Sequence, residues 1–186
     1  MNRISTRDLL IALTLVAVAV SSRLLPHEPN FTALMAVGLL AATVLRSRIL
    51  AAVVPMAAMV LSDAVIGGYN AGIMLAVYGA MLLPLALSPL LRGRLLIARA
   101  ATASVVCSVL FFTISNGAVW AFGSMYDASA SGLAACFGAA IPFFKYQLAG
   151  DLVYTLTLFA VAAALPRLVG TPTVAAQAVP ARITIR

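Results

Sequence analysis

Apolar residues fall in six long runs, and short segments rich in proline, glycine and charged residues separate them. A helix needs roughly 20 apolar residues to cross the hydrocarbon core of a bilayer. Runs such as 49–60 and 73–87 lack the strict alternation of apolar and polar positions that a transmembrane β-barrel requires. The pattern therefore predicts an all-α membrane protein, a compact bundle of six transmembrane helices. The expected spans cover about residues 8–23, 31–45, 49–66, 71–91, 100–122 and 146–165.

Composition supports membrane insertion. Of the 186 residues, 63% are hydrophobic and 9% are charged, whereas a soluble domain has about 45–50% apolar and about 25% charged residues. We expect one transmembrane domain at residues 1–168 and a disordered cytoplasmic tail at 169–186. The first run could also be a signal peptide, because Ala17-Val18-Ala19 resembles a cleavage site. An uncleaved helix is preferred, since its removal would leave an odd number of spans.

Arginines cluster at the ends of the apolar runs, a distribution that sets the orientation of membrane proteins. With six spans, one side of the membrane receives most of the basic residues and the other receives only Arg23 and Lys145. The first group consists of Arg3, Arg7, Arg46, Arg48, Arg92, Arg94, Arg99, Arg167, Arg182 and Arg186. The positive-inside rule then predicts a multi-pass membrane protein with both termini cytoplasmic. The net charge of +7 reflects this bias and does not indicate nucleic-acid binding.

Residues 132–144 decide the number of spans, because they are apolar but short and rich in glycine and alanine. A seventh span here would move the C-terminal arginines across the membrane and weaken the charge bias. We therefore expect this segment to be a short outer re-entrant or amphipathic piece before the last helix. Such a segment is stable at membrane depth only when it packs on protein.

The last apolar run carries one carboxylate, Asp151. A charge in an apolar span costs about 2.5–3.5 kcal/mol on insertion scales, so it belongs in a protein interior or a wet cavity. On a helix, Gln147, Asp151, Tyr154 and Thr155 lie at i, i+4, i+7 and i+8 and share one face. We interpret this face as the lining of a site.

With six spans, the polar side chains gather in the outer half of the bundle. This arrangement predicts a cup that opens outward and holds a small, partly polar ligand; a channel would need polar lining along its full length. Asp63 and Asp151 could instead pair with Arg23 and Lys145 and lock helices together. The candidate binding residues are Arg23, His27, Asn30, Asp63, Tyr69, Asn70, Asn116, Trp120, Lys145, Gln147 and Asp151.

Motifs for other chemistry are missing from the sequence. There is no G-x-x-x-x-G-K-[ST] loop for ATP, no H-E-x-x-H motif and no Cys/His cluster, so no cofactor or metal is expected. Cys107 and Cys136 have no metal-type spacing and are expected to be core residues. We interpret the protein as a non-enzyme. Two alternatives stay open: a small intramembrane enzyme that uses Asp63 and Asp151 as an acid/base pair, and a membrane assembly protein without a ligand.

Five short motifs carry a resemblance to a known group of proteins. They are Arg23-Leu24-Leu25-Pro26-His27-x-Pro29-Asn30-Phe31-Thr32, Ser62-Asp63, Asn116-Gly117-x-x-Trp120, Ala140-Ile141-Pro142-Phe143-Phe144 and Gly150-Asp151-Leu152. Together they resemble a family of bacterial membrane proteins that is similar to the substrate-binding S components of energy-coupling factor (ECF) transporters. The resemblance covers roughly residues 8–168.

The resemblance implies a six-helix protein that takes up a small nutrient such as a vitamin through an outer cavity capped by loops. S components dock on a transmembrane partner and two ATPases through small residues of the first helix. Ala17 and Ser21 are the matching pair here. The partners implied are therefore a small-molecule ligand, the lipid bilayer and an energy-coupling module.

Overall fold

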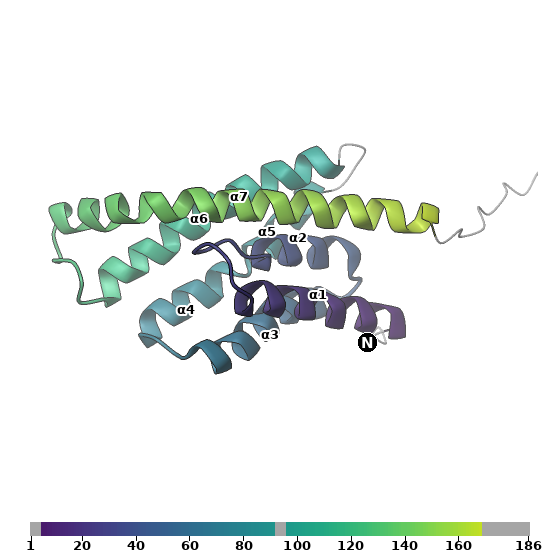
Figure 1. Ribbon diagram of the computed structural model, residues 1–186, viewed down its shortest axis with the longest axis horizontal. Coiled ribbons are helices and arrows are strands. Elements are labelled where there is room, and N and C mark those ends of the chain that lie inside the picture. The colour runs from purple at the N-terminus through teal and green to yellow at the C-terminus, as the bar shows by residue number, and fades with distance from the viewer. Residues whose placement is uncertain (1–4, 92–95, 169–186) are drawn as a thin grey trace, which may run out of the picture.

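The computed structural model of the chain describes residues 5–91 and 96–168, and this part is all-helical. The expectation of an all-α protein is confirmed, while the tail at 169–186, expected to be disordered, lies outside the described residues. Figure 1 shows the helices side by side in an elongated bundle. They are α1 (Thr6–Leu24), α2 (Leu34–Val44), α3 (Arg48–Ile66), α4 (Ala71–Ala80), α5 (Leu83–Leu87), the 3₁₀ turn η1 (Ser88–Leu91), α6 (Leu96–Phe122) and α7 (Ala130–Leu168).

Local signals in the sequence explain where several helices begin and end. Ser5 and Ser47 cap α1 and α3 by accepting hydrogen bonds from the backbone N–H groups of Asp8 and Leu50. Asn70 caps α4 in the same way, accepting from Gly72 and Ile73. Helix α3 ends at Gly67, whose φ of 105° is readily adopted only by glycine. These caps fix the short connections between consecutive helices.

Helix α2 is the centre of the bundle and packs against α1, α3, α5, α6 and α7. Every residue from 33 to 41 is buried, as expected of a helix that is apolar on all sides. With 11 residues and a rise of about 1.5 Å per residue, α2 is too short to cross a bilayer by itself. The expected span at 31–45 is therefore only partly helical.

Proline breaks the expected span at 71–91. Helix α4 ends at Ala80 and α5 begins at Leu83, with Pro84 in its first turn. Because a proline nitrogen carries no hydrogen, Pro84 cannot donate to the carbonyl of Ala80, and the helix is interrupted at that point. The segment continues as α5 and η1 to Leu91.

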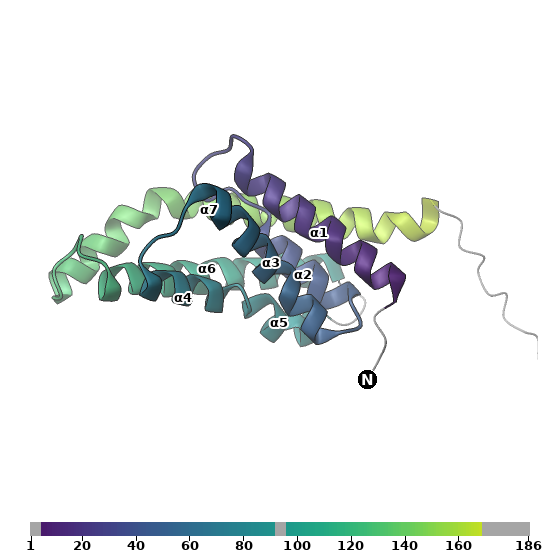
Figure 2. The same cartoon turned by 90° about the horizontal axis from the view of Figure 1, so that it is seen from below.

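The structure does not contain a separate re-entrant segment at 132–144. These residues form the N-terminal part of α7, which runs unbroken from Ala130 to Leu168. Alanine favours helix, and this part of α7 packs on α6, where the rings of Phe112 and Phe137 lie 5.6 Å apart. Packing of this kind allows an apolar helix to continue through a proline such as Pro142. Figure 2 shows α7 bending in its N-terminal part.

Four helical segments of the described chain are long and apolar enough to cross a membrane. They are Arg48–Ile66, Ala71–Leu91, Leu96–Phe122 and Ala130–Ala164. This is the property of a multi-pass membrane protein. Figure 1 shows the start of α1 and the end of α7 at the same end of the bundle. Arg7, Arg48 and Arg99 lie in the first turns of α1, α3 and α6, at that same end.

The contact between α2 and α5 can be tested at Gly38. A Cβ atom there would lie 2.9 Å from Cγ of Pro84, and the proline ring cannot rotate away. We expect Gly38→Val to lower the free energy of unfolding in detergent by about 1–3 kcal/mol, the usual range for overpacking. Denaturant unfolding followed by circular dichroism measures the change.

Gly138→Val is the matched control, because no atom lies within 4 Å of a Cβ built at Gly138. An exposed substitution of this kind should change the free energy of unfolding by less than about 0.5 kcal/mol. Wild-type stability of Gly38→Val would contradict the close packing of α2 on α5.

Candidate functional site

A cavity of about 410 Å³ lies between the helices, bordered by the α1–α2 and α3–α4 loops. Its volume falls in the range of about 300–1,000 Å³ that is typical of small-molecule sites. All the long helices contribute to its wall. The polar lining consists of Arg23, His27, Asn30, Thr32, Tyr69, Ser115, Asn116, Gln147 and Asp151, and the remaining lining is apolar.

An ion pair holds one side of the cavity. Nη1 of Arg23, in the last turn of α1, donates to Oδ1 of Asp63 on α3 at 2.7 Å and also contacts the Ser62 hydroxyl. The hydroxyl of Tyr78, on α4, donates to the other carboxylate oxygen at 2.9 Å. The exposed fractions are 16% for the Arg23 side chain and 5% for that of Asp63. The cluster therefore joins three helices, which is the locking role considered for Asp63, while Arg23 also lines the cavity.

The α1–α2 loop borders the cavity with His27 and Asn30. Asn30 has a φ of 65°, a left-handed conformation that asparagine tolerates better than most residues. The following residue, Phe31, contacts α7: its ring centroid lies 5.7 Å from that of Tyr154. A Cβ at Gly150 would come within 3.0 Å of the Phe31 backbone. Glycine at position 150 thus allows the loop to lie directly on α7.

Tyr69, in the α3–α4 loop, also lines the cavity. Partial burial, followed by the nearby Asp63 carboxylate, raises the pKa of the Tyr69 phenol, and Arg23 opposes this shift. The phenol therefore stays neutral at physiological pH and can donate a hydrogen bond to a ligand.

The α6–α7 wall carries a buried polar network. Oδ2 of Asp151 lies 2.6 Å from the Ser108 hydroxyl, which is also 2.9 Å from the Ser104 carbonyl. The amide of Gln147 donates to the Ser108 carbonyl at 3.0 Å. One helical turn beyond Asp151, the Thr155 hydroxyl donates to Ser104. The predicted polar face of α7 thus packs on α6, and Gln147 and Asp151 also border the cavity.

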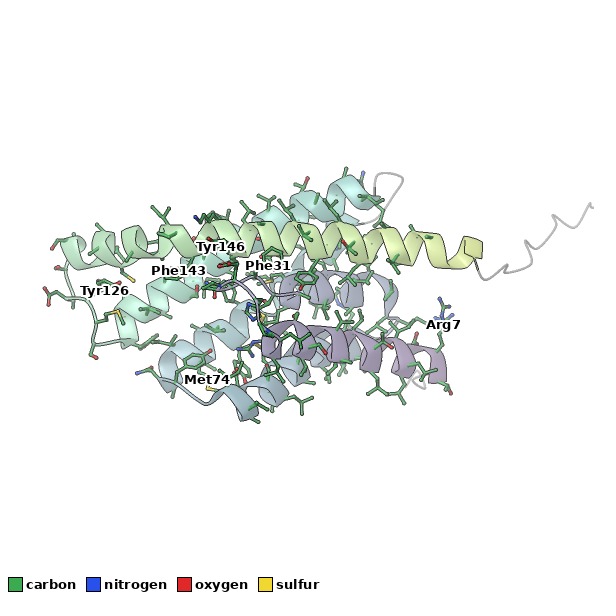
Figure 3. All side chains as sticks on the ribbon, viewed as in Figure 1. Arg7, Phe31, Met74, Tyr126, Phe143 and Tyr146 are labelled. Atoms are coloured by element: carbon green, nitrogen blue, oxygen red, sulfur yellow. The ribbon has the colours of Figure 1, made fainter. Side chains whose placement is uncertain are left out.

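Aromatic rings occupy the same wall. Phe111 and Phe112 on α6, together with Phe143 and Phe144 on α7, line the cavity. The ring centroids of Phe112 and Phe144 lie 4.7 Å apart, and the rings are tilted by 44°. Figure 3 shows Phe143 and Phe31 near the middle of the bundle, where the α1–α2 loop meets α7.

Seven of the eleven sequence-predicted site residues line this cavity, and Asp63 lies just behind it through its bond to Arg23. The other three point elsewhere. Asn70 caps α4 and donates to the Phe122 carbonyl, and Trp120 donates to the Asp127 carbonyl in the α6–α7 loop. The seven lining residues are Arg23, His27, Asn30, Tyr69, Asn116, Gln147 and Asp151.

Lys145 does not pair with Asp151. Six residues on a helix correspond to a rotation of about 600°, so the two side chains leave α7 in different directions. The Lys145 ammonium lies 4.7 Å from the centroid of the Tyr146 ring instead. Figure 3 labels Tyr146 on α7.

Ser108 and Tyr78 hold the two carboxylates but are absent from the predicted set. Their signals are weak in the sequence, because serine is common in membrane helices and one tyrosine in an apolar run is ordinary. Ser104 and Ser108 do lie at i and i+4, on one face of a helix. That spacing marks the strip of α6 that meets the polar face of α7.

Within the described residues, no three His, Cys, Asp or Glu side chains are grouped so that they could hold a metal ion. Both cysteines, Cys107 and Cys136, are buried as free thiols. The cavity is lined by hydrogen-bond donors and acceptors and by the ionisable side chains of Arg23 and Asp151. This combination suits an organic ligand.

Comparison with known proteins places the chain in a family. Residues 3–174 match the family described as a family of unknown function, DUF6580. The chain belongs to this DUF6580 family. No curated protein and no solved structure matches it. The matched range includes every residue that lines the cavity.

The ion pair gives a test of what holds this DUF6580 fold. We expect Asp63→Ala to lower the free energy of unfolding by about 3–5 kcal/mol, because it leaves the Arg23 guanidinium without its counter-ion in a mostly buried place. The double variant Arg23→Met/Asp63→Leu should be markedly more stable than Asp63→Ala. Denaturant unfolding in detergent measures both.

Glu28→Ala is the control, because Glu28 lies exposed in the α1–α2 loop, and it should change stability by less than about 0.5 kcal/mol. If Asp63→Ala were as stable as Glu28→Ala, the Arg23–Asp63 pair would not be what joins α1 to α3.

Proposed function

We propose that the protein is a membrane-embedded binding subunit for uptake of a small nutrient, similar in role to the S component of an ECF transporter. The observation that carries the proposal is the cavity of about 410 Å³ between the helices, bordered by the α1–α2 and α3–α4 loops. Its lining combines apolar side chains with a few fixed polar groups, as is usual for a small-molecule site. The bordering α1–α2 loop, anchored on α7 by Phe31, would close over the ligand.

The orientation follows from the distribution of arginines. Arg7, Arg48 and Arg99 lie at the end of the bundle away from the α1–α2 and α3–α4 loops. By the positive-inside rule, that end faces the cytoplasm and the cavity opens to the outside. In this proposal the protein resides in a bacterial cytoplasmic membrane and binds its ligand from the external side.

The surface of α1 suits a transmembrane partner. Its face with Asp8, Ala12, Leu15 and Ala19 is buried against the bundle. The outer face carries exposed Leu10, Leu13, Ala17 and Ser21, and small residues at i and i+4 allow another helix to approach closely. We propose that an energy-coupling subunit with its ATPases docks on this face.

The enzyme alternative needs Asp63 and Asp151 to act on one substrate as acid and base. In the structure each carboxylate has its own partners, Arg23 and Tyr78 for Asp63 and Ser108 for Asp151. No observation favours the alternative over binding. An assembly role without a ligand would not require an open polar cavity.

Filling the cavity tests the proposal. Ala140 lines it, whereas Ala149 lies on the exposed side of the same helix. We expect a small molecule to remain bound to protein purified from its own host and to appear as an added mass in native mass spectrometry. Ala140→Phe should lose this mass because the new ring occupies the cavity, and Ala149→Phe should keep it.

Two results would count against the proposal. Wild-type protein that carries no small molecule and binds none from a host extract would contradict a binding function. A bound molecule that survives Ala140→Phe would place the binding site elsewhere.

A further inference from the structure

Asp151 is a buried carboxylate that faces the cavity without a cation of its own. Its exposed fraction is 4%, and it borders the cavity. Within the described part of the chain, no arginine, lysine or histidine forms an ion pair with it. Its neighbours in the protein are neutral, the hydroxyl of Ser108 at 2.6 Å and the side-chain amide of Gln147. A carboxylate in such surroundings needs a neutralising partner.

The nearby cations are already engaged. Arg23 lines the cavity but is paired with Asp63 at 2.7 Å. The ring nitrogens of His27 lie 2.6 Å from the Glu28 carbonyl oxygen and 3.3 Å from that of Arg23, so the ring is held against its own loop. Lys145 lies over the Tyr146 ring, away from Asp151. The cavity therefore presents an uncompensated carboxylate on its α7 wall.

Aromatic rings line the same wall of the cavity as this carboxylate. Phe144 precedes Asp151 by seven residues, or two helical turns, on the same face of α7, and its ring packs 4.7 Å from that of Phe112. Aromatic rings attract cations through their electron-rich faces, and sites for organic ammonium groups use this together with a carboxylate. An anionic ligand could not replace the proton of Asp151 and would be repelled by the ionised carboxylate.

We propose that the ligand of this cavity is a small organic cation, an amine or other nitrogen cation attached to an apolar body. Its charge pairs with Asp151 and its body lies against Phe112 and Phe144. The inference rests on the proposed binding function and adds the chemical class of the ligand.

The Ser104–Ser108 pair explains how Asp151 stays hydrogen-bonded when the cavity holds no ligand. When Asp151 carries a proton, it donates to Ser108, and Ser108 donates to the Ser104 carbonyl, so every group is satisfied. When a ligand cation binds, Asp151 releases its proton to water in the cavity, and the Ser108 hydroxyl turns to donate to the carboxylate. The same three groups thus serve both states without a change in the backbone.

Three probes of similar size separate the charge classes: benzylamine as the cation, benzyl alcohol as the neutral molecule and benzoate as the anion. Dissociation constants are measured near neutral pH by thermal shift on detergent-purified protein. We expect benzylamine to bind at least about tenfold more tightly than the other two, the scale of a buried charge pair.

Asp151→Asn should remove this preference, because the amide keeps the size of the side chain and loses its charge. Asp127→Asn, in the exposed α6–α7 loop, is the matched control and should keep it. A second variant covers the case in which Asp151→Asn does not fold. Phe144→Leu should weaken benzylamine binding severalfold and benzyl alcohol binding less, because leucine keeps an apolar contact with the shared ring but lacks the aromatic face that attracts a cation.

The outcomes separate the two proposals. If benzyl alcohol or benzoate binds as tightly as benzylamine, or if Asp151→Asn keeps the preference, the cation inference is overturned. The same holds if benzylamine does not bind at all. A neutral or anionic molecule found on purified wild-type protein would also overturn it while supporting the proposed binding function. Loss of the cation preference in Asp151→Asn, with a cationic native ligand, supports both.

Discussion

The ion pair between Arg23 and Asp63 is the interaction on which the geometry of the cavity depends. It joins the end of α1 to α3, and Tyr78 extends it to α4. In a chain that is 63% hydrophobic, removing both charges from water is costly, so the pair is stable only with its supporting hydrogen bonds. Ser62 and Tyr78 provide them, and as a result three helix ends are held around an open space.

The packing around α2 is organised mainly by burial. Helix α2 is surrounded on all sides, and a glycine at position 38 lets the ring of Pro84 approach it. Close packing there leaves little space between the helices. The contrast between this close packing and the polar cavity beside the α1–α2 and α3–α4 loops supports the proposed role of the cavity in ligand binding.

Hydrophobic patterning was enough to predict an all-helical chain and most helix positions, because a long apolar run between capping residues favours a helix over other structures. It did not predict that α7 continues through residues 132–144, since that depends on packing against α6. The interruption after Ala80 likewise depends on one proline. Helical spacing placed Gln147 and Asp151 on one face correctly.

Partners of the polar residues were harder to predict than their positions. Asp63 was expected to bind a ligand or pair with a cation, and it pairs with Arg23, but the pairing of Asp151 with Lys145 was wrong. Long-range partners such as Ser108 are set by how α6 and α7 meet, which periodicity within one helix does not determine. Asn70 donates to the carbonyl of Phe122 at the C-terminal end of α6, where carbonyls lack helical partners, and Trp120 donates to the carbonyl of Asp127 in the α6–α7 loop.

The central claim is that the cavity and the α1–α2 loop that borders it face the outside of the cell. Cysteine labelling with a membrane-impermeant maleimide tests it directly, with wild-type protein as the control because its two cysteines are buried. Glu28→Cys lies in the α1–α2 loop and Thr6→Cys at the start of α1, and both positions are exposed. The account predicts that Glu28→Cys is labelled in intact spheroplasts and Thr6→Cys only after lysis. The reverse pattern would contradict it.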